Sequence, residues 1–392
     1  MKHFTILSTA TLAASVAAYA QTNTDTLTLT RHLDEVVVNA PIAQVTNNKS
    51  VLDCSELNQD NTGQNLPYLL SRVPALVATS DDGLGVGYTY FRIRGTDHTR
   101  INMTVNDVPL NDGESQTVFW VNMTDMASSM SRVNVQRGIG TSTNGSASFG
   151  ASINMVTNSS LFASPSDSLL ASSVTLSFNG GMYNTFREMV NAHIVLPNHW
   201  QANARFSKVN SDGFLYRTES DLYSYYGDLG WYGAKTQVIA RFFGGSEKTG
   251  MGWDGVDYNT AYGINGADRR YNPAGEYTTT AMDGSDSIAY YPNQTDNYAQ
   301  QHAQLSLIHR LSTRWTLSAT AHYTHGAGYY EQYKRKKLSY WGLPYSHKAY
   351  GMYRKQLDNH FFGGVVSAKY ISEPIDIQLG GAANYYMGDH FG

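Results

Sequence analysis

Hydrophobic and polar residues alternate with a period of two along much of the chain after residue 170. Val174, Leu176 and Phe178 are separated by Thr175, Ser177 and Asn179, and the same alternation recurs through residues 190–196, 200–207, 315–324 and 375–380. Because successive side chains of a strand point to opposite faces, this pattern predicts strands with one apolar and one polar face. Runs of about ten residues exceed the usual 5–6 of soluble sheets and are typical of transmembrane barrel strands.

The alternation and the turn residues between runs predict nine strands, at 170–179, 186–196, 199–209, 222–230, 234–245, 298–310, 314–325, 360–371 and 374–386. Every second connection is very short, namely 197–198, 231–233, 311–313 and 372–373, whereas the others are 180–185, 210–221, 246–297 and 326–359. Short turns at one end and long loops at the other are the rule for outer-membrane barrels. Aromatic residues near strand ends, such as Trp200, Trp315, Tyr323 and Tyr385, suit the girdles at the two membrane interfaces.

Residues 92–157 have a different pattern, with short apolar runs separated by Gly and Asn-Asp turns. Upstream, residues 65–71 predict a short helix ended by Pro74, and residues 75–80 predict a strand. The Gly-rich stretch 81–88 lacks both the lysine of a P-loop and the glycine spacing of a dinucleotide site, so we expect a tight loop.

The N-terminus reads as a secretory signal over residues 1–20, with Lys2 and His3 before an apolar stretch and Ala18-Tyr19-Ala20 as the cleavage site. No later apolar run approaches the roughly 20 residues of a spanning helix. With a net charge of −4 and no long basic run, nucleic acid is not an expected partner. The single cysteine excludes an intrachain disulfide, and no catalytic motif is present, so we do not expect an enzyme.

Four pieces of residues 92–157 carry a family resemblance. They are Arg92-Ile93-Arg94-Gly95, the turn 106–111 (Asn-Asp-Val-Pro-Leu-Asn), the step 135–138 (Val-Gln-Arg-Gly) and the ending 149–157 (Phe-Gly-Ala-Ser-Ile-Asn-Met-Val-Thr). In this order they resemble the plug domain of TonB-dependent outer-membrane receptors. The resemblance implies a mainly β fold, with a mixed α+β N-terminal plug domain followed by an antiparallel transmembrane β-barrel, present here only in part.

The expected domains are a signal peptide at 1–20, a leader at 21–49, the plug at 50–160 and a partial barrel at 168–392. Nine strands are fewer than the roughly 22 of a barrel that holds a plug, so we expect the N-terminal portion of a longer receptor. In the leader, Glu35, Val36, Val37 and Val38 match the TonB box, a strand offered to the energy-transducing protein TonB. The alternative is an ordinary first strand of the plug.

The resemblance implies import of a scarce ligand across the outer membrane, driven by the TonB–ExbB–ExbD complex, with outer-membrane lipid and lipopolysaccharide around the barrel. The amino-acid sequence of residues 91–157 is most similar to that of iron-chelate receptors of Bacteroidetes-type bacteria. A ferric siderophore or other iron complex is therefore the expected ligand. The iron would travel as part of the ligand, and no resident cofactor is expected. Cobalamin, haem and glycans are alternative ligands, and a non-transporting adhesin or porin is the alternative class.

Two groups of residues are candidate sites. Arg94 and Arg137 match plug arginines that, in the resembled family, pair with barrel glutamates and lock the plug. Candidate ligand contacts are Tyr88, Tyr90, Trp253, Arg269, Arg270 and Tyr330, because aromatic rings supply flat contact area and arginines attract anions. The alternative is that these loop residues are simply solvent-exposed. His98, His302 and His322 are scattered, and we expect polar roles for them rather than metal ligation.

Overall fold

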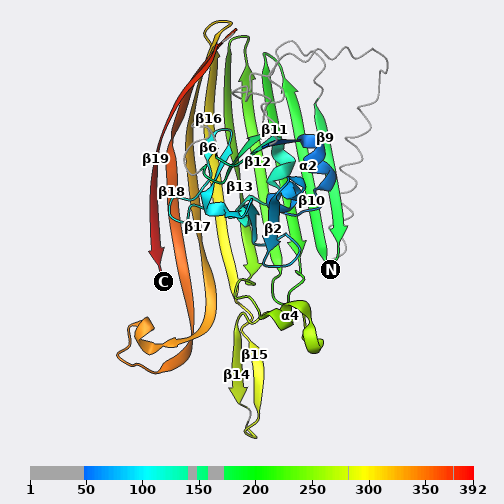
Figure 1. The fold of residues 1–392 in the computed structure, drawn as a ribbon, viewed down its shortest axis with the longest axis vertical. Coiled ribbons are helices and arrows are strands. Elements are labelled where there is room, and N and C mark those ends of the chain that lie inside the picture. The colour runs from blue at the N-terminus through cyan, green and yellow to red at the C-terminus, as the bar shows by residue number, and fades with distance from the viewer. Residues whose placement is uncertain (1–47, 140–147, 158–171, 281, 374) are drawn as a thin grey trace. The chain divides into compact units, whose positions relative to one another are not determined.

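The computed structural model describes residues 48–139, 148–157, 172–280, 282–373 and 375–392. The predicted signal peptide and the segment 35–38 lie outside these residues. The described chain consists of a small mixed domain, the plug, and a nine-stranded antiparallel sheet (Figure 1). Ion pairs and hydrogen bonds join the two, and the described residues of both belong to one compact unit.

The plug begins with strand β1 and a helix whose start is set by a capping box. The Asp53 carboxylate accepts from the backbone N–H groups of Ser55 and Glu56, and the Glu56 carboxylate accepts from the N–H of Asp53. Pro67 occupies the first turn of the next helix, where its missing N–H costs nothing. The plug helices and 3₁₀ helices are α2 (Cys54–Asp60), α3 (Leu66–Leu69), η1 (Leu70–Arg72), η2 (His98–Arg100), η3 (Trp120–Met123) and η4 (Met126–Ser129).

Two small sheets complete the plug. One has the order β1-β7-β8-β5-β6, in which β5 and β8 run parallel and the other pairs are antiparallel. The other has the order β2-β3-β4. The strands are β1 (Lys49–Asp53), β2 (Leu76–Ser80), β3 (Thr89–Ile93), β4 (Thr96–Asp97), β5 (Ile101–Val105), β6 (Val108–Pro109), β7 (Met130–Arg137) and β8 (Ala151–Thr157).

Turn chemistry explains why these plug strands are so short. Asn106 and Asp107, between β5 and β6, both have positive φ, which is what a two-residue hairpin turn of type I′ requires. Arg94 and Gly95 also have positive φ and reverse the chain between β3 and β4. The predicted Gly and Asn-Asp punctuation is therefore confirmed. The strands converge on one apolar core, whose fully buried members include Ile93, Ile101, Met103, Val105, Met130, Val133, Val135, Ile153 and Met155.

The Gly-rich loop 81–88 is tight, as predicted, and it is organised around a carboxylate. The Asp82 side chain is buried and accepts from the backbone N–H groups of Leu84 and Gly85 through Oδ1, and of Val86 and Gly87 through Oδ2. A row of N–H groups that could cradle an anion is thus filled by the chain's own aspartate.

The nine-stranded sheet has the order β19-β18-β17-β16-β13-β12-β11-β10-β9, and all its neighbours are antiparallel. In the described part of the chain, β9 and β19 are its edges. The strands are β9 (Ser173–Gly181), β10 (Thr185–Leu196), β11 (Trp200–Ser211), β12 (Ser220–Tyr232), β13 (Thr236–Gly250), β16 (Thr295–Arg310), β17 (Trp315–Lys337), β18 (Lys348–Ser372) and β19 (Ile375–Phe391).

The alternation predicted from the sequence separates the two faces of this sheet. Val174, Leu176 and Phe178 are exposed, with Phe178 at 72%, and Phe206 on β11 is exposed as well. The polar residues at the intervening positions of β11 are buried, namely Gln201, Asn203, Arg205 and Ser207. We call the face that carries the exposed apolar side chains the outward face and the other the inward face. The plug contacts the inward face, as the ion pairs and hydrogen bonds below show.

All nine predicted strands are present, but the predicted loops are too long. The expected loop 326–359 is mostly strand, because β17 and β18 stay paired from Trp315–Tyr370 to Lys337–Lys348. Only residues 338–347 connect them, including η8 (Leu338–Trp341). The expected loop 246–297 shortens to 251–294 and contains α4 (Tyr258–Tyr262), η7 (Ile264–Gly266) and the hairpin β14 (Glu276–Thr280) and β15 (Asp286–Tyr290). Backbone pairing thus continues beyond the apolar band from which the strands were predicted.

The connections still divide by length, except that 182–184 at the loop end is as short as the turns at the opposite end. One end of the sheet, the turn end, has residues 197–199, 233–235, 311–314 and 373–374 between strands. The other, the loop end, has 182–184, 212–219, 251–294 and 338–347. Among the described residues, no helix is both long enough and apolar enough to cross a membrane.

The close approach of Gly85 to Tyr68 provides a test of the loop packing. Gly85 and Gly255 have similar positive φ values of 84° and 70°, but only at Gly85 would an added Cβ meet another residue, 2.7 Å from Cδ2 of Tyr68. We expect Gly85→Ala to lower the free energy of unfolding by about 1–3 kcal/mol more than Gly255→Ala, because overpacking adds to the shared backbone cost. Urea titration of the folded protein measures this, and equal effects of the two variants would contradict the packing.

Candidate functional site: a cavity and an ion-pair network at the plug boundary

A cavity of about 420 Å³ lies between the tip of the plug and the inward face of the sheet near its loop end. The plug contributes Tyr88, which precedes β3, Tyr90, which lies within β3, and residues of the segment 109–123. The sheet and its loops contribute the remaining wall, which includes Glu247, Trp253, Asp296, Tyr298, His302, Tyr329, Tyr330, Lys355, Phe361 and Tyr386.

Aromatic rings hold one side of the cavity together. Trp253 lies edge-on to Tyr88, with centroids 5.6 Å apart, and edge-on to Tyr330 at 5.7 Å. These three residues come from the plug, from loop 251–294 and from β17, so the cavity is assembled from segments far apart in the sequence. Edge-to-face packing of this kind stabilises each ring in a defined orientation and presents flat apolar area to a ligand.

Two buried carboxylates line the cavity, on neighbouring strands. Glu247 of β13 and Asp296 of β16 are both more than nine-tenths buried. The hydroxyl of Tyr88 donates to the Asp296 carboxylate. Burial, with the nearby charges of Glu247 and Asp296, raises the pKa of Tyr88 well above its ordinary value, so this phenol stays protonated and acts as a donor.

A second phenol–carboxylate contact connects the cavity to the Gly-rich loop. The hydroxyl of Tyr90 donates to Oδ2 of Asp81 at 3.2 Å. Burial raises the pKa of Asp81 to about 6; the Tyr90 hydrogen bond opposes this increase and the adjacent Asp82 carboxylate adds to it. Asp82 organises the loop 81–88, which ends at Tyr88, and the Asp81 contact joins Tyr90 to the same loop.

The predicted ligand contacts divide into two groups. Tyr88, Tyr90, Trp253 and Tyr330 line the cavity, whereas Arg269 and Arg270 are not among its lining residues. Arg269 is exposed on loop 251–294. Lys355, whose ammonium lies 5.8 Å from the Tyr330 ring centroid, is the one lysine or arginine among the described lining residues.

Arg270 has a structural contact instead. Its Nε donates to the carbonyl oxygen of Phe214 at 2.7 Å, and its guanidinium lies over the rings of Tyr216 and Tyr183, 4.4 and 5.1 Å from their centroids. Arg270 therefore joins the loop 251–294 to the loop 212–219 and to the β9–β10 connection. The charge of Arg270 can be read from the sequence. Its stacking partners could not be predicted, because they come from other loops.

The predicted lock arginines lie close together, but their described contacts are on the plug itself. Arg94 donates through Nη2 to the side-chain oxygen of Asn48 at 2.6 Å. Arg137 donates through Nε to the Asn48 carbonyl oxygen at 3.3 Å and through Nη1 to that of Pro74 at 3.2 Å. The two motifs thus meet at the start of the described plug.

An ion-pair contact that was not predicted from the sequence joins plug and sheet. Here the acidic residue is on the plug and the arginines are on the sheet, the reverse of the predicted lock. Asp125 on the plug, at the start of η4, lies 3.0 Å from Nε of Arg187 on β10 and 3.5 Å from Nη1 of Arg205 on β11. Asp125 is 2% exposed, and both arginines are buried too. Its φ of 51° is left-handed, a conformation that Asp tolerates better than most residues.

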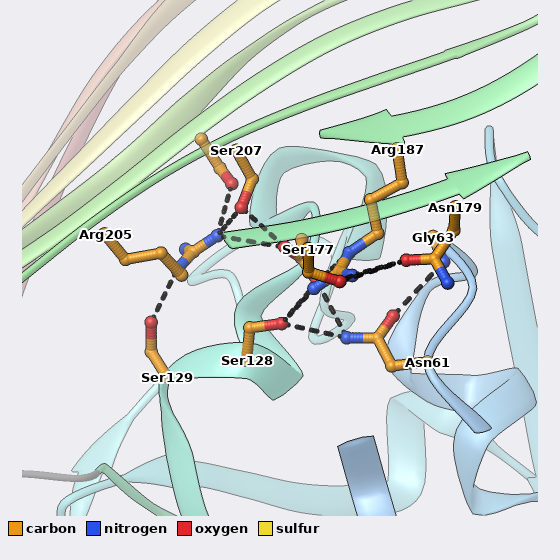
Figure 2. A network of polar contacts seen from close by, with 11 residues as sticks. Asn61, Gly63, Ser128, Ser129, Ser177, Asn179, Arg187, Arg205 and Ser207 are labelled. Atoms are coloured by element: carbon orange, nitrogen blue, oxygen red, sulfur yellow. Dashed lines mark hydrogen bonds and ion pairs between the residues drawn. The ribbon is translucent and has the colours of Figure 1, made fainter. Parts of the chain in front are cut away.

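Hydroxyl and amide groups satisfy the rest of this buried network (Figure 2). On the plug, Asn61 Nδ2 and Ser128 Oγ each donate to Asp125 Oδ1 at 2.7 Å. From the sheet, Ser207 Oγ donates to Asp125 Oδ2 at 2.5 Å. Arg187 Nη2 donates to Ser128 Oγ at 2.6 Å, and Arg205 Nε to Ser129 Oγ at 2.6 Å, so both arginines also contact the plug directly.

The net charge of the network explains how Asp125 stays ionised. Burial by itself raises the pKa of a carboxyl, but Arg205 and Arg187, with the Ser207 and Ser128 hydroxyls, outweigh it, and the pKa of Asp125 is lowered. Arg205 belongs to the polar half of the alternation on β11, so its inward position was predictable. Its partner was not, because Asp125 sits 80 residues earlier in a stretch without a recognisable pattern.

His302 and His322 make polar contacts, whereas His98 packs against an aromatic ring. His302 and His322 are buried on the inward face. Nδ1 of His302 is 2.9 Å from Thr324 Oγ1, and Nε2 of His322 is 2.8 Å from Asn384 Oδ1. His98 packs beside Tyr90, with ring centroids 5.6 Å apart.

Comparison with known proteins agrees with this architecture. Residues 41–152 match the TonB-dependent receptor plug domain family. No curated protein matches the chain. The ferric-catecholate import receptor Fiu of E. coli K12, in its open form, matches with a TM-score of 0.62 at 14% identity, over 90% of this chain and 51% of that one.

Two further solved structures give the same result. The siderophore receptor PiuA of Acinetobacter baumannii matches with a TM-score of 0.57 at 14% identity, over 87% of this chain and 46% of that one. The copper transporter OprC matches with a TM-score of 0.62 at 13% identity, over 88% and 47%. The chain thus spans about half the length of these structures.

Residues 41–152 thus match the plug domain of TonB-dependent receptors, and the described chain shares the fold of solved receptors of that kind. Its mixed N-terminal domain is the plug, and its nine-stranded antiparallel sheet is a part of the barrel wall.

The buried Asp125 network yields a stability prediction. Replacing Asp125 by Asn keeps the side chain's size but leaves Arg187 and Arg205 without their counter-charge. We expect a loss of about 3–5 kcal/mol, the usual range for breaking a buried ion pair, measured by urea titration. Asp283→Asn, on an exposed loop, is the control and should have little effect.

The pH dependence of stability separates the effect of the Asp125 charge from the effect of side-chain shape. Because the folded pKa of Asp125 is lowered, its contribution is fully present above the unfolded value of about 4 and is lost as the pH falls through the folded value. The stability of Asp125→Asn should lack this acid-dependent loss. Identical pH profiles for wild type and variant would show that the ion pairs contribute nothing to stability.

Proposed function

We propose that the protein works in the outer membrane as an importer of a scarce metal chelate, most simply a ferric siderophore or other iron complex. The observation that carries this proposal is the position of the cavity. It lies where the plug tip, the sheet and the long loop 251–294 meet, so one bound molecule would contact the plug and the wall together. The loop end would face the outside and the turn end the periplasm, following the rule for such barrels.

The contacts around the cavity suggest how ligand binding would reach the plug. A ligand against Trp253 and Tyr330 would also meet Tyr88, whose hydroxyl bonds to Asp296 on β16. Displacing that bond would free the plug tip from the wall on one side. Tyr90 and Asp81 continue the chain of contacts into the loop 81–88. The ligand would thus compete for bonds that now join plug and sheet.

The energy would come from the inner membrane, because the outer membrane has no nucleotide supply. We propose that residues 1–20 direct export, and that Glu35 with Val36, Val37 and Val38 adds as a strand to TonB, which works with ExbB and ExbD. The outward apolar face would contact membrane lipid and lipopolysaccharide. No catalytic role and no resident cofactor are proposed, since the iron would arrive within the ligand.

The chemistry of the cavity narrows the ligand. Its aromatic side suits a flat or apolar surface, and Lys355 offers one positive charge. Burial and the neighbouring Asp296 raise the pKa of Glu247 well above its ordinary value, so the two groups together carry about one negative charge at neutral pH, and this charge would repel a carboxylate or phenolate. We therefore propose a chelate that directs hydrogen-bond donors or positive charge toward these two residues, and its anionic part toward Lys355.

Crosslinking tests the transport class. In a Cys54→Ser background, Val37→Cys should form a disulfide with a cysteine placed in the strand-accepting region of TonB, and adding a transported chelate should increase the yield. Thr279→Cys, at the loop end, is the control and should not react. No crosslink from Val37→Cys, with normal export of the protein, would overturn the TonB-dependent mechanism.

Tryptophan fluorescence tests the ligand proposal. Catecholate, hydroxamate and citrate complexes of iron can be titrated against the purified receptor, and binding in the cavity should quench Trp253. Trp253→Phe should lose the quench. Glu247→Gln with Asp296→Asn should weaken binding of the preferred chelate at least tenfold, or about 1.4 kcal/mol, while Asp283→Asn should not. Tighter binding by the double variant would contradict the proposed orientation.

A further inference from the structure

Two histidines and an aspartate gather on the outward face of β17 and β18, away from the cavity. His325 and His360 stand directly opposite each other in the register of the two strands, and Asp358 lies two residues from His360 on the same face. His325 Nε2 is 3.0 Å from Asp358 Oδ1, and His360 Nε2 is 3.6 Å from the same atom. One ligand atom from each of the three residues lies within 4.8 Å of the others.

The spacing of these atoms matches a metal coordination shell. At zinc–ligand bonds of about 2.0–2.1 Å, a tetrahedral site places its ligand atoms about 3.3 Å apart. The two measured separations, 3.0 and 3.6 Å, lie on either side of that value. The imidazole rings are nearly parallel, with centroids 4.8 Å apart and an interplanar angle of 25°, so both Nε2 atoms can face Asp358.

A neighbouring phenol orients one of the rings. The hydroxyl of Tyr323 is 2.7 Å from Nδ1 of His360, which leaves Nε2 of that ring for a metal. Metal-binding histidines usually have their other nitrogen fixed by such a partner. Tyr323 is on the outward face too, one alternation before His325.

A second carboxylate beside the cluster also favours binding of a cation. Asp389 of β19 is directly opposite Asp358 in the strand register, so two carboxylates occupy facing positions on one surface. Like charges directly opposite each other destabilise a sheet. A divalent ion bound at Asp358 would offset that repulsion, and an ordinary histidine–aspartate hydrogen bond offsets it less.

The position along the strands makes the cluster accessible. From Trp315, which packs on Tyr370 near the turn end, to Tyr323 there are eight residues, or about 26 Å of strand at 3.3 Å each. With the usual tilt of barrel strands this nearly spans the apolar band of about 25 Å. The cluster begins at the next outward residue, so it lies in the polar interface, and its three side chains are 34%, 47% and 38% exposed.

We propose that His325, Asp358 and His360 bind a divalent transition metal of the Zn²⁺ type, with the fourth position open to an oxygen ligand. Two imidazoles favour Zn²⁺, Cu²⁺ or Ni²⁺ over Ca²⁺ and Mg²⁺. The ion clamps β17 to β18 at the base of the long paired extension that carries Tyr329, Tyr330 and Lys355 of the cavity. This site does not depend on the proposed transport function, because it faces away from the cavity.

Zinc titration tests the site, with the receptor purified in detergent without a polyhistidine tag. Wild type should bind Zn²⁺ with an occupancy of one at this site, and Ca²⁺ should not compete. His325→Gln and His360→Gln should each weaken that binding at least tenfold, and Tyr323→Phe should weaken it less. His199→Gln, at the turn end, is the matched control and should bind as wild type does.

A second measurement keeps the test independent of folding defects. Cobalt(II) should give the visible absorption of a tetrahedral site in wild type and in His199→Gln, and this band should be absent from His325→Gln. Far-UV circular dichroism identifies any variant that has lost its sheet, and for such a variant the comparison rests on Asp358→Asn. Zinc isotherms that superimpose for wild type, His325→Gln and His360→Gln would overturn the proposal.

Discussion

The contact between plug and barrel wall depends on a buried carboxylate, Asp125, that keeps its counter-charges and hydrogen-bond donors. Asp125 is enclosed where η4 meets β10 and β11, and it stays ionised because Arg187 and Arg205 approach it from the wall. Serine hydroxyls and Asn61 complete the network, so that little of the desolvation cost remains uncompensated. Removing Asp125 would leave two buried arginines without their counter-charge, which is more costly than never having formed the network.

Under the proposed function the plug has to rearrange, and the polar contacts at its boundary with the sheet suit that change. The boundary also has apolar contacts, since Val86 and Val121 of the plug pack with Val209 and Leu222 of the sheet, but its ion pairs and hydrogen bonds can be exchanged for water or ligand groups at lower net cost. The cavity lies on the same boundary and uses the same chemistry, because Tyr88 contacts Asp296 across it. Under the proposed function, ligand binding and plug release are two uses of one polar surface.

The outward face carries a different kind of chemistry. Most of its exposed side chains are apolar, as Phe178, Phe206 and Leu305 illustrate. Beyond the aromatic residue Tyr323 this face gains polar residues, with His325, Asp358 and His360 in contact, although the neighbouring Met387 is exposed as well. The metal proposed there would act on strand pairing rather than on the imported ligand. Tyr329, Tyr330 and Lys355, nearer the loop end of the same two strands, line the cavity.

Period-two alternation determined the nine strands, their order along the chain and which face of each is apolar. It could do so because every second side chain of a strand faces the same environment, so the residue types alternate within each strand. Turn residues such as Asn106 and Asp107 determined the short plug strands in the same local way. Four cavity residues, Tyr88, Tyr90, Trp253 and Tyr330, were predictable from their aromatic character near loops. Strand ends beyond the apolar band were not, since pairing between β17 and β18 continues where alternation fades.

Only the tertiary structure decided which charges meet. Arg94 and Arg137 were recognisable from their motifs, yet their described contacts are with Asn48 and Pro74. Asp125 finds Arg187 and Arg205 across 62 and 80 residues, and His325 finds His360 through strand register. Alternation is a property of neighbouring residues and can be read along the chain. Ion pairing depends on distances of a few ångströms between residues brought together by folding, and no local pattern records it.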